Sequence, residues 1–279
     1  MKRRVITLAL LAALTVGAAT GCGTNSSDTA SAKAADTQSV EITNVSYDPT
    51  RELYAAYNEV FAKHWKEQSG QDVSVVQSHG GSGKQALEVA NGLQADVVTL
   101  ALEGDVDAVK DAGLIEDGYT SEFPLDSSPY TSSIVFLVRK DNPKNIQDWD
   151  DLLIDEHPGE YEIVVPSVSI LCQPTVAVVD EVVDKRGTRD VATEYLSYLY
   201  SDEAQKLEAE WYYRPSNEDI LKEYAYSGDS NTITELPSDG KWIITNVDLT
   251  DIAHFGGWSE ATEKHFADGG LFDSIYEEK

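Results

Sequence analysis

Two expected strand-to-helix turns carry residue types that could bind an anion. The segment 48–50 (Asp-Pro-Thr) follows one expected strand, and the segment 80–83 (Gly-Gly-Ser-Gly) follows the next. Helix N-termini present unpaired N–H groups and a partial positive charge, and both suit an oxyanion. Gly81 and Gly83 would let the backbone approach a ligand, and the Ser82 hydroxyl would add a donor. Taken alone the pattern is weak, because a Gly-Gly-Ser-Gly segment is more often only a turn.

Other chemistries find little support in the sequence. The glycine-rich segment does not match a nucleotide-binding P-loop, because Ser78 and Gln85 occupy the positions that need glycine and Ser or Thr. The five histidines have no metal-ligand spacing, and His79, beside the glycine turn, is expected to be structural. No nucleophile elbow is present, and the carboxylates are expected on solvated faces. We therefore expect no enzyme activity, no metal and no cofactor.

The elements that must position these turns follow from the hydrophobic pattern. In the amino-terminal half, strands alternate with helices, which indicates a parallel α/β sheet that binds ligands at the carboxyl ends of its strands. Strands are expected at 40–47, 72–77 and 96–102, and helices at 51–67, 84–93 and 104–112. Further strands are expected at 132–138, 163–166 and 174–179, and further helices at 188–200, 202–211 and 258–266.

The first 39 residues read as an export signal and a tether. Lys2, Arg3 and Arg4 precede the apolar run 5–16, which is too short to span a bilayer. Residues 19–22 (Ala-Thr-Gly-Cys) are typical of a lipoprotein signal peptide at 1–21, although an ordinary signal with an incidental cysteine is the alternative. We expect lipid attachment at Cys22, a flexible tether over 22–39, and an extracytoplasmic protein anchored to the cell membrane.

Charge and cysteine content narrow the choice of partners. The formal net charge of −28 disfavours nucleic acid and anionic membrane surfaces. It does not exclude a small anion, because surface charge is screened within ~8 Å at physiological salt and local N–H groups decide what a pocket binds. Two cysteines cannot form a disulfide framework, and Cys172 is expected to be a buried thiol.

A family resemblance runs along most of residues 40–279. The chain resembles the sulfate- and thiosulfate-binding proteins of bacterial ABC transporters, and the SYDPTRELY and SHGGSGKQ motifs are specific. The resembling segments are NVSYDPTRELYAAYNEVFAKHW, QSHGGSGKQA, ADVVTLALEGDVDA, PYTSSIVFLVRKDNPKNIQDWDDL, EIVVPSVSILCQPTVAVVDEVVDKRGT, EYLSYLYSDEAQKLEAEWYYRP and FGGWSEATEKHFADGGLFD.

The resemblance implies a fold, a ligand and a partner. The fold would be α/β, of the type II periplasmic-binding-protein class, with a first lobe over 40–130 completed by part of 216–279 and a second lobe over 131–215. The protein would be a monomeric lipoprotein that delivers sulfate or thiosulfate to the membrane permease of an ABC importer. Family members hold sulfate between the lobes with neutral donors, and two of these match here, namely the backbone at Asp48 and the Ser82 side chain. Sulfate offers only acceptors, so such a pocket can reject protonated phosphate.

The chain departs from the family within the second lobe. Family members carry a further block, which supplies the second lobe's donors, between Trp-Asp-Asp-Leu and Glu-Ile-Val-Val-Pro; here the chain is shortened near 154–160. Each hydrogen bond to a charged group contributes roughly 1.5–3 kcal/mol, so two donors supply about 3–6 kcal/mol. Micromolar affinity needs about 8 kcal/mol. An alternative is therefore a shortened member without tight sulfate binding, kept as a surface interaction protein or a non-functional remnant.

Overall fold

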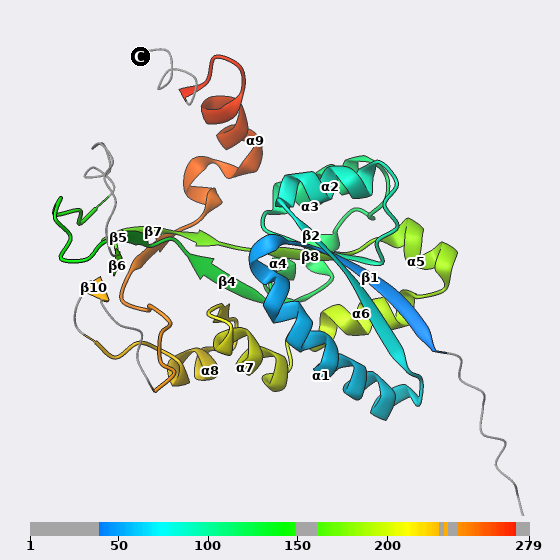
Figure 1. Cartoon of the computed structure of the whole chain (residues 1–279). Helices are drawn as coiled ribbons and strands as arrows, with labels where there is room; N and C mark the ends of the chain where they lie inside the picture. The colour runs from blue at the N-terminus through cyan, green and yellow to red at the C-terminus, as the bar shows by residue number, and fades with distance from the viewer. Residues whose placement is uncertain (1–38, 149–160, 229–231, 234–238, 272–279) are drawn as a thin grey trace, which may run out of the picture. The chain divides into compact units, whose positions relative to one another are not determined.

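The computed structural model describes residues 39–148, 161–228, 232–233 and 239–271 (Figure 1). The expected signal peptide, Cys22 and the tether up to residue 38 lie outside the described residues. The expected deletion point at 154–160 lies outside them as well. Among the described residues, no helix combines the length and the apolar character needed to cross a membrane.

A four-stranded sheet forms the centre of the amino-terminal half, in the order β2-β1-β3-β8. Strand β1 is parallel to both β2 and β3, which confirms the expected parallel sheet, and β8 returns antiparallel to β3. The strands span β1 Val40–Tyr47, β2 Val73–Gly80, β3 Val97–Leu100 and β8 Thr175–Val178.

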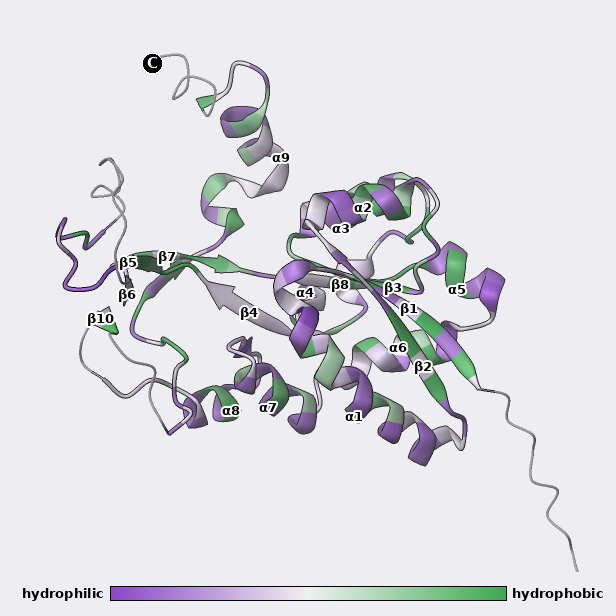
Figure 2. Ribbon diagram, in the orientation of Figure 1, coloured by the Kyte–Doolittle hydropathy of each residue, from purple (hydrophilic) through white to green (hydrophobic). Residues whose placement is uncertain are grey.

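Helices cover both faces of this sheet (Figure 1). Because side chains alternate along a strand, Ile42 packs with α1 and α6, whereas Val45 packs on the other face with α2 and α3. The hydrophilic stretches of α1 and α2 are purple in Figure 2. The helices span α1 Arg51–Ser69, α2 Ser82–Ala90, α3 Glu103–Asp111, α5 Asp180–Arg186, α6 Arg189–Tyr198 and α7 Asp202–Glu210.

Two further sheets have the orders β11-β7-β4-β9 and β10-β6-β5. The single strand expected at 132–138 is two strands in different sheets. The Ser169 hydroxyl accepts from the Ile134 N–H at 3.0 Å and donates to the Ile134 carbonyl at 2.7 Å. It therefore satisfies both backbone groups of Ile134, the residue that follows the first of the two strands. The strands span β4 Tyr130–Ser133, β5 Phe136–Arg139, β6 Tyr161–Val164, β7 Val168–Cys172, β9 Arg214–Pro215, β10 Thr232–Ile233 and β11 Asp248–Thr250.

Short helices complete the described chain. The helix expected at 258–266 is a short α-helical segment followed by a short π-helical segment. These short elements are η1 Asp48–Thr50, η2 Tyr119–Ser121, α4 Pro124–Ser127, α8 Glu218–Glu223, η4 Ile252–Phe255, α9 Gly257–Ala261 and η5 Thr262–Phe266.

Two carboxylates correct the expectation that the acidic residues are solvated. Asp96 is fully buried at the start of β3 and accepts hydrogen bonds from the Thr43 N–H at 2.7 Å and the Thr188 hydroxyl at 2.5 Å. Glu208 on α7 is also fully buried. Cys172, in contrast, is half-buried rather than buried.

Candidate functional site

The two predicted anion-binding turns lie at the same edge of the sheet. Tyr47 pairs with Gly80 across β1 and β2, and Ser46 pairs with Thr99 across β1 and β3. The carboxyl ends of the three parallel strands therefore meet, and α1, α2 and α3 begin beside one another. Three helix N-termini at one edge give a local excess of N–H donors in a chain of high negative charge.

The Asp48 turn is held by its own side chains. Asp48 opens a short 3-10 segment after β1, and Pro49 lies in its first turn. The buried Thr50 hydroxyl donates to the Tyr47 carbonyl at 2.7 Å. The Asp48 carboxylate accepts from Arg51 Nη2 at 2.6 Å, and both side chains are more than half exposed. Arg51 thus compensates the Asp48 charge, which leaves the backbone at Asp48 as the group suited to an anion.

The glycine turn leads directly into α2. Gly81 is the N-cap, with extended backbone angles (φ −63°, ψ 136°), and its carbonyl accepts from the Gln85 N–H at 2.9 Å. The helix begins at Ser82, two residues before the expected start at Lys84. Ser82 and Gly83 therefore lie in the first turn, where N–H groups lack partners within the helix. No acidic residue lies in this first turn, and Gly81 and Gly83 are exposed.

The Ser82 hydroxyl is already engaged in this structure. Its oxygen accepts from the Ala101 N–H at 2.9 Å, and it donates to Asp105 Oδ2 at 2.5 Å. The expectation of a hydroxyl ready to meet a ligand therefore needs a correction, because binding requires its release from Asp105. Asp105 was missed from the sequence, although an aspartate five residues after the end of β3, at the same edge of the sheet, was a visible signal.

His79 adds no positive charge to this edge. Burial and the nearby Arg51 guanidinium lower the pKa of its imidazole below 6.5. Its Nε2 lies 2.6 Å from Gln77 Oε1, within the same strand. An anion here would therefore be met mainly by neutral donors.

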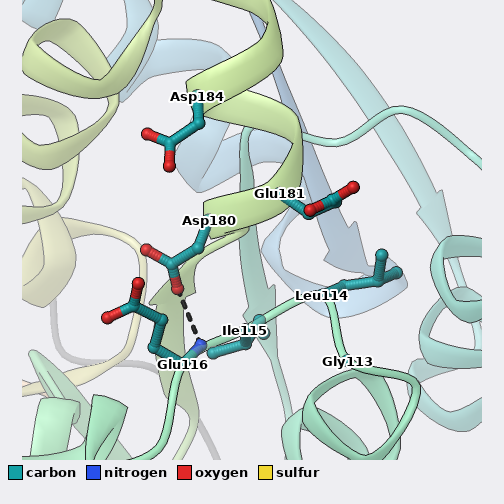
Figure 3. A pocket seen from close by; sticks show the side chains of 7 residues that line it. All are labelled: Gly113, Leu114, Ile115, Glu116, Asp180, Glu181 and Asp184. Carbon is teal, nitrogen blue, oxygen red and sulfur yellow. Dashed lines mark hydrogen bonds between the residues drawn. The ribbon is translucent and has the colours of Figure 1, made fainter.

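A pocket of about 210 Å³ lies elsewhere, between the end of α3 and the start of α5 (Figure 3). Asp180 in its wall accepts from the Glu116 N–H at 2.8 Å. Because β8 runs antiparallel to β3, this pocket is at the sheet edge opposite the two turns. Its acidic lining is unsuited to an anion. The lining residues are Gly113, Leu114, Ile115, Glu116, Asp180, Glu181 and Asp184.

Comparison with known proteins finds a matching family model, sequence relatives and a solved structure of the same fold. A family model described as bacterial extracellular solute-binding protein matches residues 50–156. A sulfate-binding protein from Escherichia coli is 38% identical, covering 85% of this chain and 93% of the relative. A thiosulfate-binding protein from Pseudomonas aeruginosa is 33% identical, covering 84% of this chain and 91% of the relative. The solved sulfate-binding protein SubI from Mycobacterium tuberculosis has a TM-score of 0.63 at 21% identity, covering 80% of this chain and 98% of that chain, and shows the same fold.

The alignment lengths also show that this chain is shortened. The alignment with the Escherichia coli protein is 320 positions long, whereas 85% of this 279-residue chain is about 237 residues. About 80 aligned positions therefore face a gap in this chain. This agrees with the missing block, whose place near 154–160 stays a prediction.

Proposed function

Because this chain belongs to the family of bacterial sulfate- and thiosulfate-binding proteins, we propose that it captures sulfate or thiosulfate outside the cytoplasm for an ABC importer. Its fold is the α/β fold of the type II periplasmic binding proteins. The proposal includes a two-lobed arrangement with a shortened second lobe, lipid anchoring at Cys22, and a monomer that meets the importer's permease. No enzymatic role is part of the proposal.

One observation supports a ligand at the carboxyl edge of the sheet. The pairing of Tyr47 with Gly80 brings the Asp48 turn next to the Gly81–Gly83 turn, so the N-termini of α1 and α2 lie beside each other. Backbone N–H groups and the Ser82 hydroxyl would meet an oxyanion there, with Gly81 and Gly83 leaving its approach open. A fully ionised tetrahedral anion offers acceptors to all of these donors.

The gap of about 80 aligned positions favours a second candidate function. If the second lobe has lost its donors, the protein would bind sulfate only weakly and act as a surface interaction protein. The two candidates differ in ligand affinity, which calorimetry measures directly.

Titration calorimetry at constant ionic strength tests the proposal, with sulfate, thiosulfate and phosphate as separate ligands. We expect sulfate or thiosulfate to bind and to raise the melting temperature, because a ligand that binds only the folded state stabilises it by RT ln(1 + [L]/Kd). Ser82→Ala should weaken binding by less than the roughly 10- to 150-fold that one hydrogen bond to a charged group is worth, because binding also breaks the bond from Ser82 to Asp105.

Ser197→Ala is the matched control, because Ser197 lies on an exposed face of α6 away from both turns. It should leave affinity unchanged. Equal affinity in Ser82→Ala and the wild type would mean that the Ser82 hydroxyl adds no net free energy to binding. A wild type that binds neither anion would support the second candidate function.

A further inference from the structure

The carboxylate of Asp105 lies where an anion would be expected at the first turn of α2. Its Oδ2 accepts from the Ser82 hydroxyl at 2.5 Å. Its Oδ1 would lie 3.3 Å from a Cβ placed on Gly83, so the absence of a side chain there gives the carboxylate close access to the helix start. Asp105 belongs to the first turn of α3, the neighbouring helix at this edge of the sheet.

The hydrogen-bonding capacity of Ser82 makes this contact consequential. A hydroxyl has one hydrogen to donate. The Ser82 oxygen already accepts from the Ala101 N–H at 2.9 Å, which fixes the oxygen and leaves its hydrogen for one acceptor. That acceptor is Asp105 here, and an oxyanion would compete for the same hydrogen.

We propose that Asp105 is an internal competitor of the ligand, a residue that sets oxyanion affinity by holding the Ser82 hydroxyl in the unliganded protein. The inference rests on the proposed function, since it concerns the same turn and the same ligand class. Binding then comprises two coupled events, release of Ser82 from Asp105 and capture of Ser82 by the oxyanion. The ligand gains only the difference between two charge-assisted hydrogen bonds, and it approaches a fixed negative charge.

This competition bears on a chain with few donors. The family-level block that would supply further donors is missing, so the free energy lost in releasing Ser82 is a larger share of the total. We therefore expect the wild type to bind the oxyanion weakly, and we expect its affinity to rise when the charge of Asp105 is removed.

The test uses Asp105→Asn and Asp105→Ala in the full chain, with sulfate and thiosulfate titrated at constant ionic strength. Asparagine keeps the shape and an acceptor but removes the charge, and alanine removes both. We expect affinity to rise about five- to tenfold in Asp105→Asn and at least as much in Asp105→Ala, because a charged partner of Ser82 is lost. Asp111→Asn, an exposed residue at the end of the same helix, removes the same charge without touching Ser82 and should leave affinity unchanged.

A double-mutant cycle of Ser82→Ala and Asp105→Ala, measured as unliganded melting temperature, shows whether the two side chains interact in solution. We expect non-additive losses, and additive ones would overturn the inference. If Asp105→Asn binds no tighter than the wild type, Asp105 positions Ser82 rather than competing, which also overturns it while the proposed function stands. Failure of the wild type and of every variant to bind would overturn both. Binding by the Asp105 variants alone would support both.

Discussion

A single carboxyl on α7 illustrates what burial does to one residue. The Glu208 side chain is fully buried, and its Oε2 accepts a hydrogen bond from Gln205 Nε2 at 2.7 Å. Its Oε1 has no hydrogen-bond partner among the described residues. Burial raises the pKa of this carboxyl well above 4.5. The folded protein therefore keeps a proton on Glu208 at pH values where the unfolded chain has lost it.

This proton makes stability depend on pH in a defined direction. Above about pH 4.5 the folded state binds more protons at this site than the unfolded state, so stability falls as pH rises, until the pH exceeds the folded-state pKa. Glu208→Gln keeps the shape and removes the ionisable group. We expect the variant to gain stability over the wild type by about 1.4 kcal/mol per pH unit from pH 4.5 up to the folded-state pKa of Glu208, with no further gain above that pKa and with the two proteins converging at pH 4. Melting curves from pH 4 to pH 8 measure the difference.

Glu210→Gln on the exposed face of the same helix is the matched control. Its melting temperature should track the wild type at every pH. A difference in stability between Glu208→Gln and the wild type that does not change with pH would mean that the pKa of Glu208 is the same in the folded and unfolded chains.

Between elements, Asp96 joins the central sheet to two helices. It lies at the start of β3, accepts from Thr43 of β1, and pairs with Arg186 at the end of α5 and Thr188 before α6. Asp96→Ala removes the acceptor for all three partners and leaves Arg186, which is 28% exposed, without its carboxylate. We expect a loss of about 3 kcal/mol in the free energy of unfolding, measured by denaturant titration.

A second Asp–Arg contact in the same region is the comparison. Asp184 accepts from Arg189 Nε at 2.7 Å, but its side chain is 65% exposed. Asp184→Ala should leave the free energy of unfolding close to that of the wild type, because exposed ion pairs are screened by water and salt. If the two variants lose equal stability, burial does not govern the strength of the Asp96 contact.

The elements also show how far sequence reasoning reaches. The hydrophobic pattern predicted β1, α1, β3 and α3 within a few residues, because each helix buries one face and the two strands contribute to the core on both faces of the sheet. It missed β7 and α5. Two of the five residues of β7 are exposed, and α5 is short, so neither shows a clear period. The break between β4 and β5 depends on Ser169, which is distant in sequence, and no local pattern reveals it.

The same limit applies to the candidate site. Strand-helix alternation predicted that the turns at Asp48 and Ser82 belong to the carboxyl edge of a sheet, and the pairing of Tyr47 with Gly80 places them side by side. The contact between Ser82 and Asp105 could not be predicted, since it joins the starts of two helices 23 residues apart. Local patterns indicate where backbone donors gather, but they do not show which side chain occupies them.

At the scale of the whole molecule, charge and ligand binding cannot be treated separately. The chain carries 49 acidic and 21 basic residues, for a formal charge of −28. A net charge this far from zero destabilises the compact state through self-repulsion. The Debye length falls from about 30 Å at 0.01 M salt to about 8 Å at 0.15 M, so salt should relieve much of this repulsion over that range.

We therefore expect NaCl to raise the melting temperature, with most of the rise below about 0.2 M. A gain of about 1 kcal/mol corresponds to about 2–4 °C for a domain of 150–250 residues. Screening levels off once the Debye length is short, whereas exclusion of salt from the surface acts in proportion to concentration, so the shape of the curve separates the two causes. A melting temperature that is flat below 0.2 M would show that self-repulsion does not limit stability. If the rise is found, sulfate must be compared with NaCl at equal ionic strength, because a divalent anion would raise the melting temperature of this chain by screening alone, even without a site.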